Sequence, residues 1–176
     1  MLSYSTANWK VKSKKEVVMR LRKFTLLAIT VAMSSLVLGS IAQAADNQAG
    51  TWKLNVAKSK YSPGPAPKEG TLTIESQADG LKFTIHGTDA EGKAVHFEMS
   101  PKYDGKDYPM TGNPDADMIS MKKINDDTIE TVSKKGGKPV MTVRSVVSKD
   151  GKTRTSTQKG TNAKGQKVNN TLVYDR

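Results

Sequence analysis

Segments in which apolar and polar side chains alternate recur from residue 50 to residue 174 of this 176-residue chain. Residues 81–85 are one example, with Leu81, Phe83 and Ile85 at every second position. A period of two places successive side chains on opposite faces of a β-strand, and no segment after residue 45 shows the sustained period of an amphipathic helix. The pattern predicts strands at residues 50–56, 71–75, 81–85, 94–100, 117–123, 128–134, 140–147, 153–159 and 168–174.

Turn-forming sequences separate these segments at close and regular spacing. Asp79-Gly80 and Gly136-Gly137 each lie between two predicted strands. Asp-Gly and Gly-Gly favour tight antiparallel hairpins because both place a residue easily in the backbone conformation that such turns need. We therefore expect an all-β domain, an antiparallel up-and-down meander of about eight to ten strands that closes as a barrel or packs as a sandwich.

Two connections are too long to be tight hairpins. Residues 61–70 contain three prolines in alternation, which predicts an extended crossing from the first strand to the second and excludes a helix. Residues 101–114 form the second long connection and carry Tyr103 and Tyr108. Because loops with aromatic residues at the end of a sheet often contact ligands, we expect both tyrosines to be available to a ligand.

The N-terminal quarter of the chain has the pattern of a targeting segment. After Met19 come basic residues, an apolar run at residues 25–38 and the small-residue motif Ala42-Gln43-Ala44, which together are typical of a cleaved signal peptide. A retained membrane anchor is the alternative, but a span needs about twenty apolar residues. We expect residues 1–18 to be a non-native or disordered extension, residues 19–44 to be a signal peptide, and residues 45–176 to be one exported domain, periplasmic or secreted from a bacterium.

Charge and cysteine content support the same prediction. The whole chain has a formal net charge of +11, but residues 45–176 hold 21 basic and 16 acidic side chains, with the lysines scattered among the carboxylates. That distribution is typical of a solvated surface rather than of a nucleic-acid-binding stripe. The chain has no cysteine, which excludes disulfides, thiol catalysis and attachment of a lipid at the cleavage site.

The two ends of the predicted domain resemble lipocalins and the related fatty-acid-binding barrels, together the calycin-type barrels. Gly50-Thr51-Trp52 is similar to the Gly-x-Trp of the first lipocalin strand, and residues 172–176 are similar to the closing strand of the fatty-acid-binding barrels. The overall pattern also resembles small exported bacterial lipocalin-like proteins. The resemblance implies a barrel around a small-molecule cavity, here without a helical lid, and Leu172 stands where fatty-acid-binding barrels carry a carboxylate-binding Arg.

An apolar or amphipathic ligand would meet aromatic side chains and one cation. Arg144 is the one Arg in a strongly apolar predicted strand, and it could hold an anionic headgroup together with Tyr174 if both faced the interior. Its alternation with Val143 and Val147 suggests instead that it points outward. The candidate ligand-binding residues are Trp52, Phe83, Phe97, Tyr103, Tyr108, Arg144 and Tyr174.

Residues 153–159 form a predicted strand without an apolar residue on either face. Such a strand either lies at the edge of a sheet, where polar side chains discourage pairing with other chains, or lines a wet cavity. We expect an edge strand.

Metal binding and catalysis have little support in the sequence. His86 and His96 could approach each other across a hairpin, and with Met99 could form a copper site, although Met99 also fits the core face of its strand. Asp104, Asp107, Asp115 and Asp117 match no calcium-loop spacing. We predict no metal, no cofactor and, in the absence of nucleophile, metalloprotease or phosphate-loop motifs, no enzymatic activity.

Two functions stay open at this point. The first is an exported protein that binds a small apolar or amphipathic molecule inside its barrel. The second is a non-catalytic interaction or stress-related envelope protein with a filled barrel. Nucleic-acid binding is not expected, and the mature chain is not expected to be an integral membrane protein, because its predicted strands are shorter than about nine residues and carry lysines.

Overall fold

The computed structural model describes residues 46–176, which belong to one compact unit and form ten β-strands and no α-helix. The predicted extension at residues 1–18 and the predicted signal peptide at residues 19–44 lie outside the described residues. The strands are β1 (Gly50–Leu54), β2 (Glu69–Gln77), β3 (Gly80–Thr88), β4 (Ala94–Met99), β5 (Tyr108–Thr111), β6 (Met118–Asn125), β7 (Thr128–Lys135), β8 (Lys138–Val147), β9 (Thr153–Thr161) and β10 (Lys167–Asp175).

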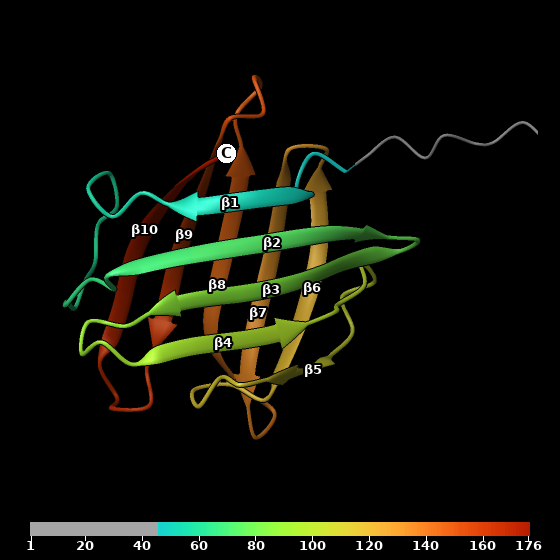
Figure 1. Cartoon of the computed structure of the whole chain (residues 1–176). Helices are drawn as coiled ribbons and strands as arrows, with labels where there is room; N and C mark the ends of the chain where they lie inside the picture. Colours follow the sequence, from blue (N-terminus) through green and yellow to red (C-terminus); the bar gives the residue numbers. More distant parts are fainter. Residues whose placement is uncertain (1–45) are drawn as a thin grey trace, which may run out of the picture. The chain divides into compact units, whose positions relative to one another are not determined.

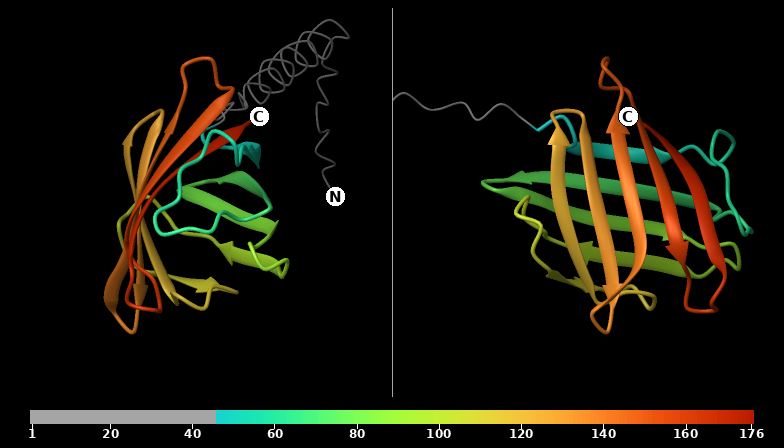
Figure 2. Two further views of the ribbon diagram at one scale, coloured as in Figure 1. Left: turned by 90° about the vertical axis from the view of Figure 1, so that its left-hand side faces the viewer. Right: turned by 180° about the vertical axis from the view of Figure 1, so that it is seen from behind.

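The strands form a closed antiparallel barrel in which each strand pairs with its neighbours in sequence and β1 pairs with β10. The barrel is flattened into two layers. Strands β1 to β5 run across strands β6 to β10 (Figure 1), and the view from the side separates the two layers (Figure 2). The predicted all-β meander is therefore confirmed, and closure leaves no long unpaired sheet edge.

The alternation in the sequence determines which side chains fill the barrel. Leu72 and Ile74 of β2, Leu81 and Phe83 of β3, and Met121 of β6 point inward and are almost completely buried. Burial of such side chains is the main favourable term in folding, since each contributes about 1.5–3 kcal/mol when removed from water. This cluster gives strands β2, β3 and β6 an apolar inner face.

One end of the barrel is closed by the segment that precedes β1. Trp52 is fully buried there, and its indole Nε1 donates a hydrogen bond of 3.0 Å to the carbonyl of Gln48. The guanidinium of Arg176, the last residue, lies 4.2 Å from the centre of the Trp52 ring and donates to the carbonyl of Ala49. These contacts, together with β1–β10 pairing, fix both ends of the described chain to the same end of the barrel.

Gly50 is required at this closed end. Its φ of +136° is rarely adopted by other residues, and a Cβ atom there would lie 2.8 Å from Nη2 of Arg176. Any other residue would displace Arg176 from Trp52. The Gly50-Thr51-Trp52 motif is thus explained by packing against the last residue.

Two expectations for individual segments were wrong. The predicted loop at residues 101–114 contains the short strand β5, which bridges β4 and β6 through two residue pairs on each side. The strand predicted to lie at a sheet edge, β9, pairs with both β8 and β10 along its length. Strand β9 is polar because it lines a cavity, the alternative to an edge strand: one of its faces points into the interior of the barrel.

The connection from β1 to β2, residues 55–68, contains no helix, as predicted for residues 61–70, of which Glu69 and Gly70 already belong to β2. The connection is held against β10, since Lys60 bridges Thr171 and the backbone of Asn169 donates to the carbonyl of Ser62. Within residues 46–176, no helix is long and apolar enough to cross a membrane.

Candidate functional site: a two-faced cavity inside the barrel

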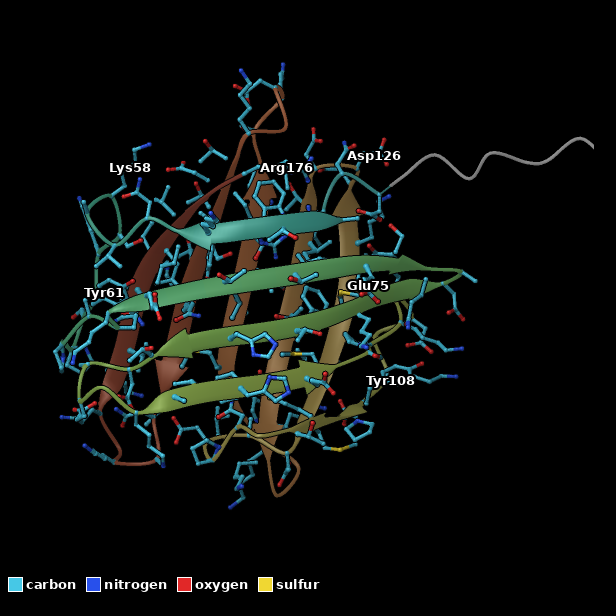
Figure 3. All side chains as sticks on the ribbon, viewed as in Figure 1. Lys58, Tyr61, Glu75, Tyr108, Asp126 and Arg176 are labelled. Atoms are coloured by element: carbon cyan, nitrogen blue, oxygen red, sulfur yellow. The ribbon has the colours of Figure 1, made fainter. Side chains whose placement is uncertain are left out.

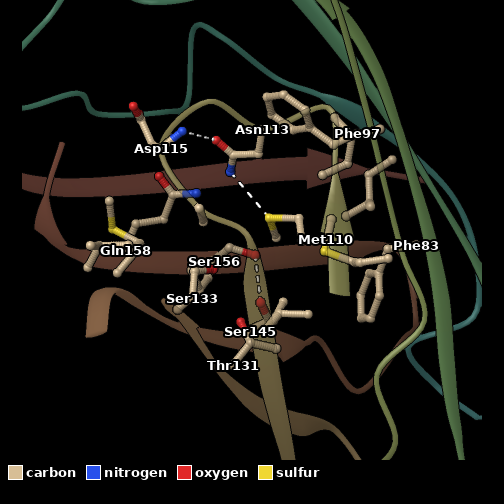
Figure 4. Close-up of a pocket in the computed structure, with 18 of the residues that line it drawn as sticks. Phe83, Phe97, Met110, Asn113, Asp115, Thr131, Ser133, Ser145, Ser156 and Gln158 are labelled. Atoms are coloured by element: carbon tan, nitrogen blue, oxygen red, sulfur yellow. Dashed lines mark hydrogen bonds between the residues drawn. The ribbon is translucent and has the colours of Figure 1, made fainter. Parts of the chain in front are cut away.

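The barrel encloses a cavity of about 330 Å³ between its two layers (Figure 4). One wall is apolar and comes from the inward positions of β2 to β6. The opposite wall is largely polar and comes from β7 to β10. The apolar wall consists of Leu72, Phe83, Ile85, Phe97, Met99, Met110 and Ile119. The polar wall includes Thr131, Ser133, Ser145, Arg154, Ser156, Gln158 and Tyr174.

Two hydroxyl groups meet in the middle of the polar wall. Ser145 of β8 and Ser156 of β9 lie directly opposite each other in the strand register, and their Oγ atoms are 2.8 Å apart (Figure 4). Both residues are buried. A hydroxyl donates one hydrogen bond and accepts two, so this pair has hydrogen-bonding capacity left for a group inside the cavity.

Arg154 lies beside this pair and is the most unusual residue of the cavity. It is only 3% exposed, and its Nη1 donates to the side-chain Oε1 of Gln48. Its Nε–H is buried and has no hydrogen-bond partner, and no carboxylate within the described residues forms an ion pair with it. Burying a guanidinium without a paired counter-charge costs free energy. A hydrogen-bond acceptor that reached Arg154 would lower this cost.

Arg154 nevertheless remains charged at neutral pH. Burial lowers the pKa of its guanidinium to about 10, opposed by the nearby Tyr174, Tyr103 and Asp46. The arginine thus presents a positive charge to the cavity over the whole physiological range.

Tyr174 of β10 lies opposite Arg154 in the strand register. Burial raises the pKa of its phenol to about 12, although Arg154 acts in the other direction. The phenol is therefore neutral at physiological pH and can donate a hydrogen bond to an acceptor near Arg154.

The acidic residue that acts on Arg154, Asp46, is engaged elsewhere. Its carboxylate accepts a hydrogen bond of 2.6 Å from the Tyr103 hydroxyl and lies 3.6 Å from Nζ of Lys123. Burial, with help from Asp46, raises the pKa of Tyr103 well above its usual value. Asp46 therefore acts on Arg154 electrostatically, but it does not accept a hydrogen bond from the Nε–H of Arg154.

The structure brings three of the predicted ligand-binding residues together and leaves four outside the cavity. Phe83, Phe97 and Tyr174 line it. Trp52 is part of the closed end of the barrel, and Tyr103 packs beside the core with its hydroxyl on Asp46. Tyr108 is the first residue of β5 (Figure 3), and its hydroxyl donates a hydrogen bond to the carboxylate of Asp104. Arg144 is exposed on the outer face of β8.

The groups considered for metal binding do not assemble around the cavity. His86 and His96 are exposed, whereas Met99 is buried in the interior, so the strands separate imidazole from thioether. In residues 46–176 no three His, Cys, Asp or Glu side chains are placed to hold a metal ion together. Asp107, for example, pairs with Lys134 at 2.8 Å.

Sequence reasoning missed Arg154, Ser145 and Ser156. A signal for them exists in the polar strand at residues 153–159, where Arg154, Ser156 and Gln158 share one face. In a closed barrel one face of that strand must point into the interior, either this face or the one with Thr153, Thr155 and Thr157. The edge interpretation concealed it.

No protein-family model matches the chain, and a search of curated proteins gives no match. The physical features of the cavity therefore carry the functional argument.

A double substitution tests whether Arg154 is an uncompensated buried charge. Gln48→Leu removes the acceptor of Arg154 Nη1 and is expected to lower the free energy of unfolding by about 1–3 kcal/mol. Adding Arg154→Met to that variant is expected to recover part of the lost stability, since it removes the charge left without its acceptor, whereas the Asp127 carbonyl still lacks the Nε2 donor of Gln48. Urea unfolding followed by circular dichroism measures both values. A double variant less stable than Gln48→Leu alone would show that Arg154 is a satisfied structural residue.

Proposed function

We propose that this protein binds a small amphipathic molecule in the barrel, with an anionic group of the ligand on Arg154. The single observation that carries the proposal is the buried guanidinium of Arg154, a residue that lines the cavity, whose Nε–H has no hydrogen-bond partner and which has no carboxylate partner among the described residues. A carboxylate, sulfate or phosphate oxygen would supply the missing acceptor and the missing negative charge.

The remaining polar groups fit the same ligand end. Tyr174 and the Ser145–Ser156 hydroxyl pair lie on the same wall as Arg154 and offer hydrogen bonds beside it. An anionic group there would be held by charge-assisted hydrogen bonds, which are about twice as strong as neutral ones.

The opposite wall fits an apolar ligand body. It presents two phenylalanine rings, Phe83 and Phe97, and aliphatic and thioether side chains. A cavity of about 330 Å³ is at the small end of the range of ligand sites, which are mainly apolar with a few placed polar groups. The ligand is therefore expected to be small, with one charged end.

The cavity extends toward the end of the barrel that carries two basic hairpins. Val140 and Met141 at the start of β8 and Thr161 at the end of β9 line the cavity, and the β7–β8 and β9–β10 turns lie at this end of the barrel (Figure 1). These hairpins, residues 133–141 and 157–169, contain six lysines and no acidic residue. These lysines add positive charge at this end of the barrel, although Asp115 also lines the cavity and Lys134 pairs with Asp107.

The cavity is also what favours this function over an interaction protein with a filled barrel. A filled interior would leave no space between the walls, whereas here the polar wall and the apolar wall face each other across a hollow (Figure 4). We infer a binding role rather than catalysis, a proposal that rests on the lack of catalytic motifs in the sequence.

We also propose that binding takes place outside the cytoplasm, in the periplasm or the medium of a bacterium. The proposal rests on the charge and hydropathy pattern of residues 19–44, and it accords with the absence of cysteine.

A matched pair of arginine variants tests the binding proposal. The wild-type protein is expected to bind decanoate more tightly than decan-1-ol, measured by displacement of a fluorescent apolar probe. Arg154→Met is expected to lower decanoate affinity by about 10- to 100-fold, the value of a charge-assisted hydrogen bond, with little effect on decan-1-ol.

Arg144→Met is the control, because Arg144 carries the same charge on the neighbouring strand but faces outward. It is expected to leave both affinities unchanged. An Arg154→Met variant that still prefers decanoate, or an Arg144→Met variant that loses the preference equally, would refute the role of Arg154.

Export is tested by the mass of the protein recovered from cell fractions. Expression of the full chain in a Gram-negative bacterium is expected to yield a periplasmic protein that begins near Ala45, as read by intact-mass spectrometry. A protein that keeps residues 19–44, or stays in the cytoplasmic fraction, would contradict the proposal.

A further inference from the structure

The two histidines of the chain lie side by side on the outer surface of the barrel, on neighbouring strands. His86 of β3 is paired with His96 of β4 in the antiparallel register. Both are exposed, and their Nδ1 atoms are 3.2 Å apart, with ring centres separated by 4.4 Å. On the same two strands, Phe83, Ile85 and Phe97 point inward to the cavity, so the pair is separate from the ligand site.

We propose that His86 and His96 together bind a first-row transition-metal ion such as Zn²⁺ or Cu²⁺ through their Nδ1 atoms. Zn–N(His) bonds are about 2.0–2.1 Å long, so two donors 3.2 Å apart subtend an angle of about 100° at the metal. That angle lies between the square-planar and tetrahedral values. Water completes the coordination, since the pair is exposed and no third His, Cys, Asp or Glu of residues 46–176 joins it.

The position of Glu98 supports this geometry independently. Its carboxylate lies 3.7 Å from Nε2 of His96, the ring nitrogen that does not face His86. A carboxylate on that side favours the tautomer with hydrogen on Nε2, which leaves a lone pair on Nδ1 for a metal. In many metal sites a carboxylate hydrogen-bonded to the outer ring nitrogen orients the imidazole ligand; Glu98 lies on that side of His96, at 3.7 Å and so beyond hydrogen-bonding distance.

The surroundings of the pair do not oppose a cation. On the outer face of β3 and β4 the flanking positions are Thr84 and Thr88 on one strand and Ala94 and Glu98 on the other. None of them is basic, although the chain has 28 Lys and Arg residues. Without a metal, one Nδ1 must carry a proton to avoid two lone pairs meeting, and a metal ion takes the place of that proton.

Metal titration of the full, untagged protein tests the site. The wild type is expected to bind one equivalent of Zn²⁺ in isothermal titration calorimetry, and each of His86→Gln and His96→Gln is expected to weaken binding by more than about tenfold. Electron paramagnetic resonance with Cu²⁺ is expected to show two nitrogen donors in the wild type and at most one in each variant. Both residues are exposed, so the fold is expected to be unchanged by circular dichroism.

Glu98→Gln, compared with Glu75→Gln, shows whether Glu98 orients the imidazole of His96 or only adds negative charge to the outer face. It is expected to weaken Zn²⁺ binding by about 10-fold, the lower end of the effect of such outer partners. Glu75→Gln removes the same charge elsewhere on the outer face (Figure 3), opposite Lys82 in the strand register, and is expected to have no effect. Zn²⁺ binding that is unchanged in both histidine variants, or no saturable binding by the wild type, would overturn the proposed metal site. Equal effects of Glu98→Gln and Glu75→Gln would show that Glu98 does not position His96.

Discussion

Gln48 connects the closure of the barrel to the chemistry of its cavity. Its carbonyl accepts the indole N–H of Trp52, its side-chain Nε2 donates to the carbonyl of Asp127, and its Oε1 accepts from Arg154. The residue is fully buried, so each of these bonds forms without competition from water. Because Gln48 fixes Nη1 of the guanidinium, the orientation of Arg154 and the direction of its free Nε–H depend on the same segment that closes the barrel.

The flattened barrel explains why a charge can be kept inside it. The two walls of the cavity differ in character: the inward side chains of β2 to β6 are apolar, while β7 to β10 contribute mainly hydroxyls, an amide and Arg154. An amphipathic ligand matches both walls at once, because its body removes apolar surface from water and its charged end satisfies the guanidinium. A wholly apolar ligand would leave the cost of the buried charge in place.

The sequence predicted the strand array well and the site only in part. Alternation and hairpin turns act locally, so nine of the ten strands, and the inward direction of Phe83 and Phe97, could be inferred from short windows. Strand β5 was not predicted because Pro109 and the surrounding turn residues give it no alternating pattern. Arg154 was not predicted because its strand is polar on both faces. Which face becomes interior depends on the closure of β1 on β10, a contact between the two ends of the domain. Arg144, the more conspicuous arginine, lies outside, as its local alternation with Val143 and Val147 suggested.

The most direct test of the account follows the side-chain Nε–H resonance of Arg154 by NMR during titration with decanoate and with decan-1-ol. If Arg154 is the anion site, decanoate moves this resonance downfield and protects it from exchange, because a new acceptor forms a hydrogen bond. Decan-1-ol is expected to shift the signals of Phe83 and Phe97 with a much smaller effect on Arg154. An Arg154 resonance that is unchanged by decanoate while the signals of the cavity wall move would contradict an anion site at the guanidinium.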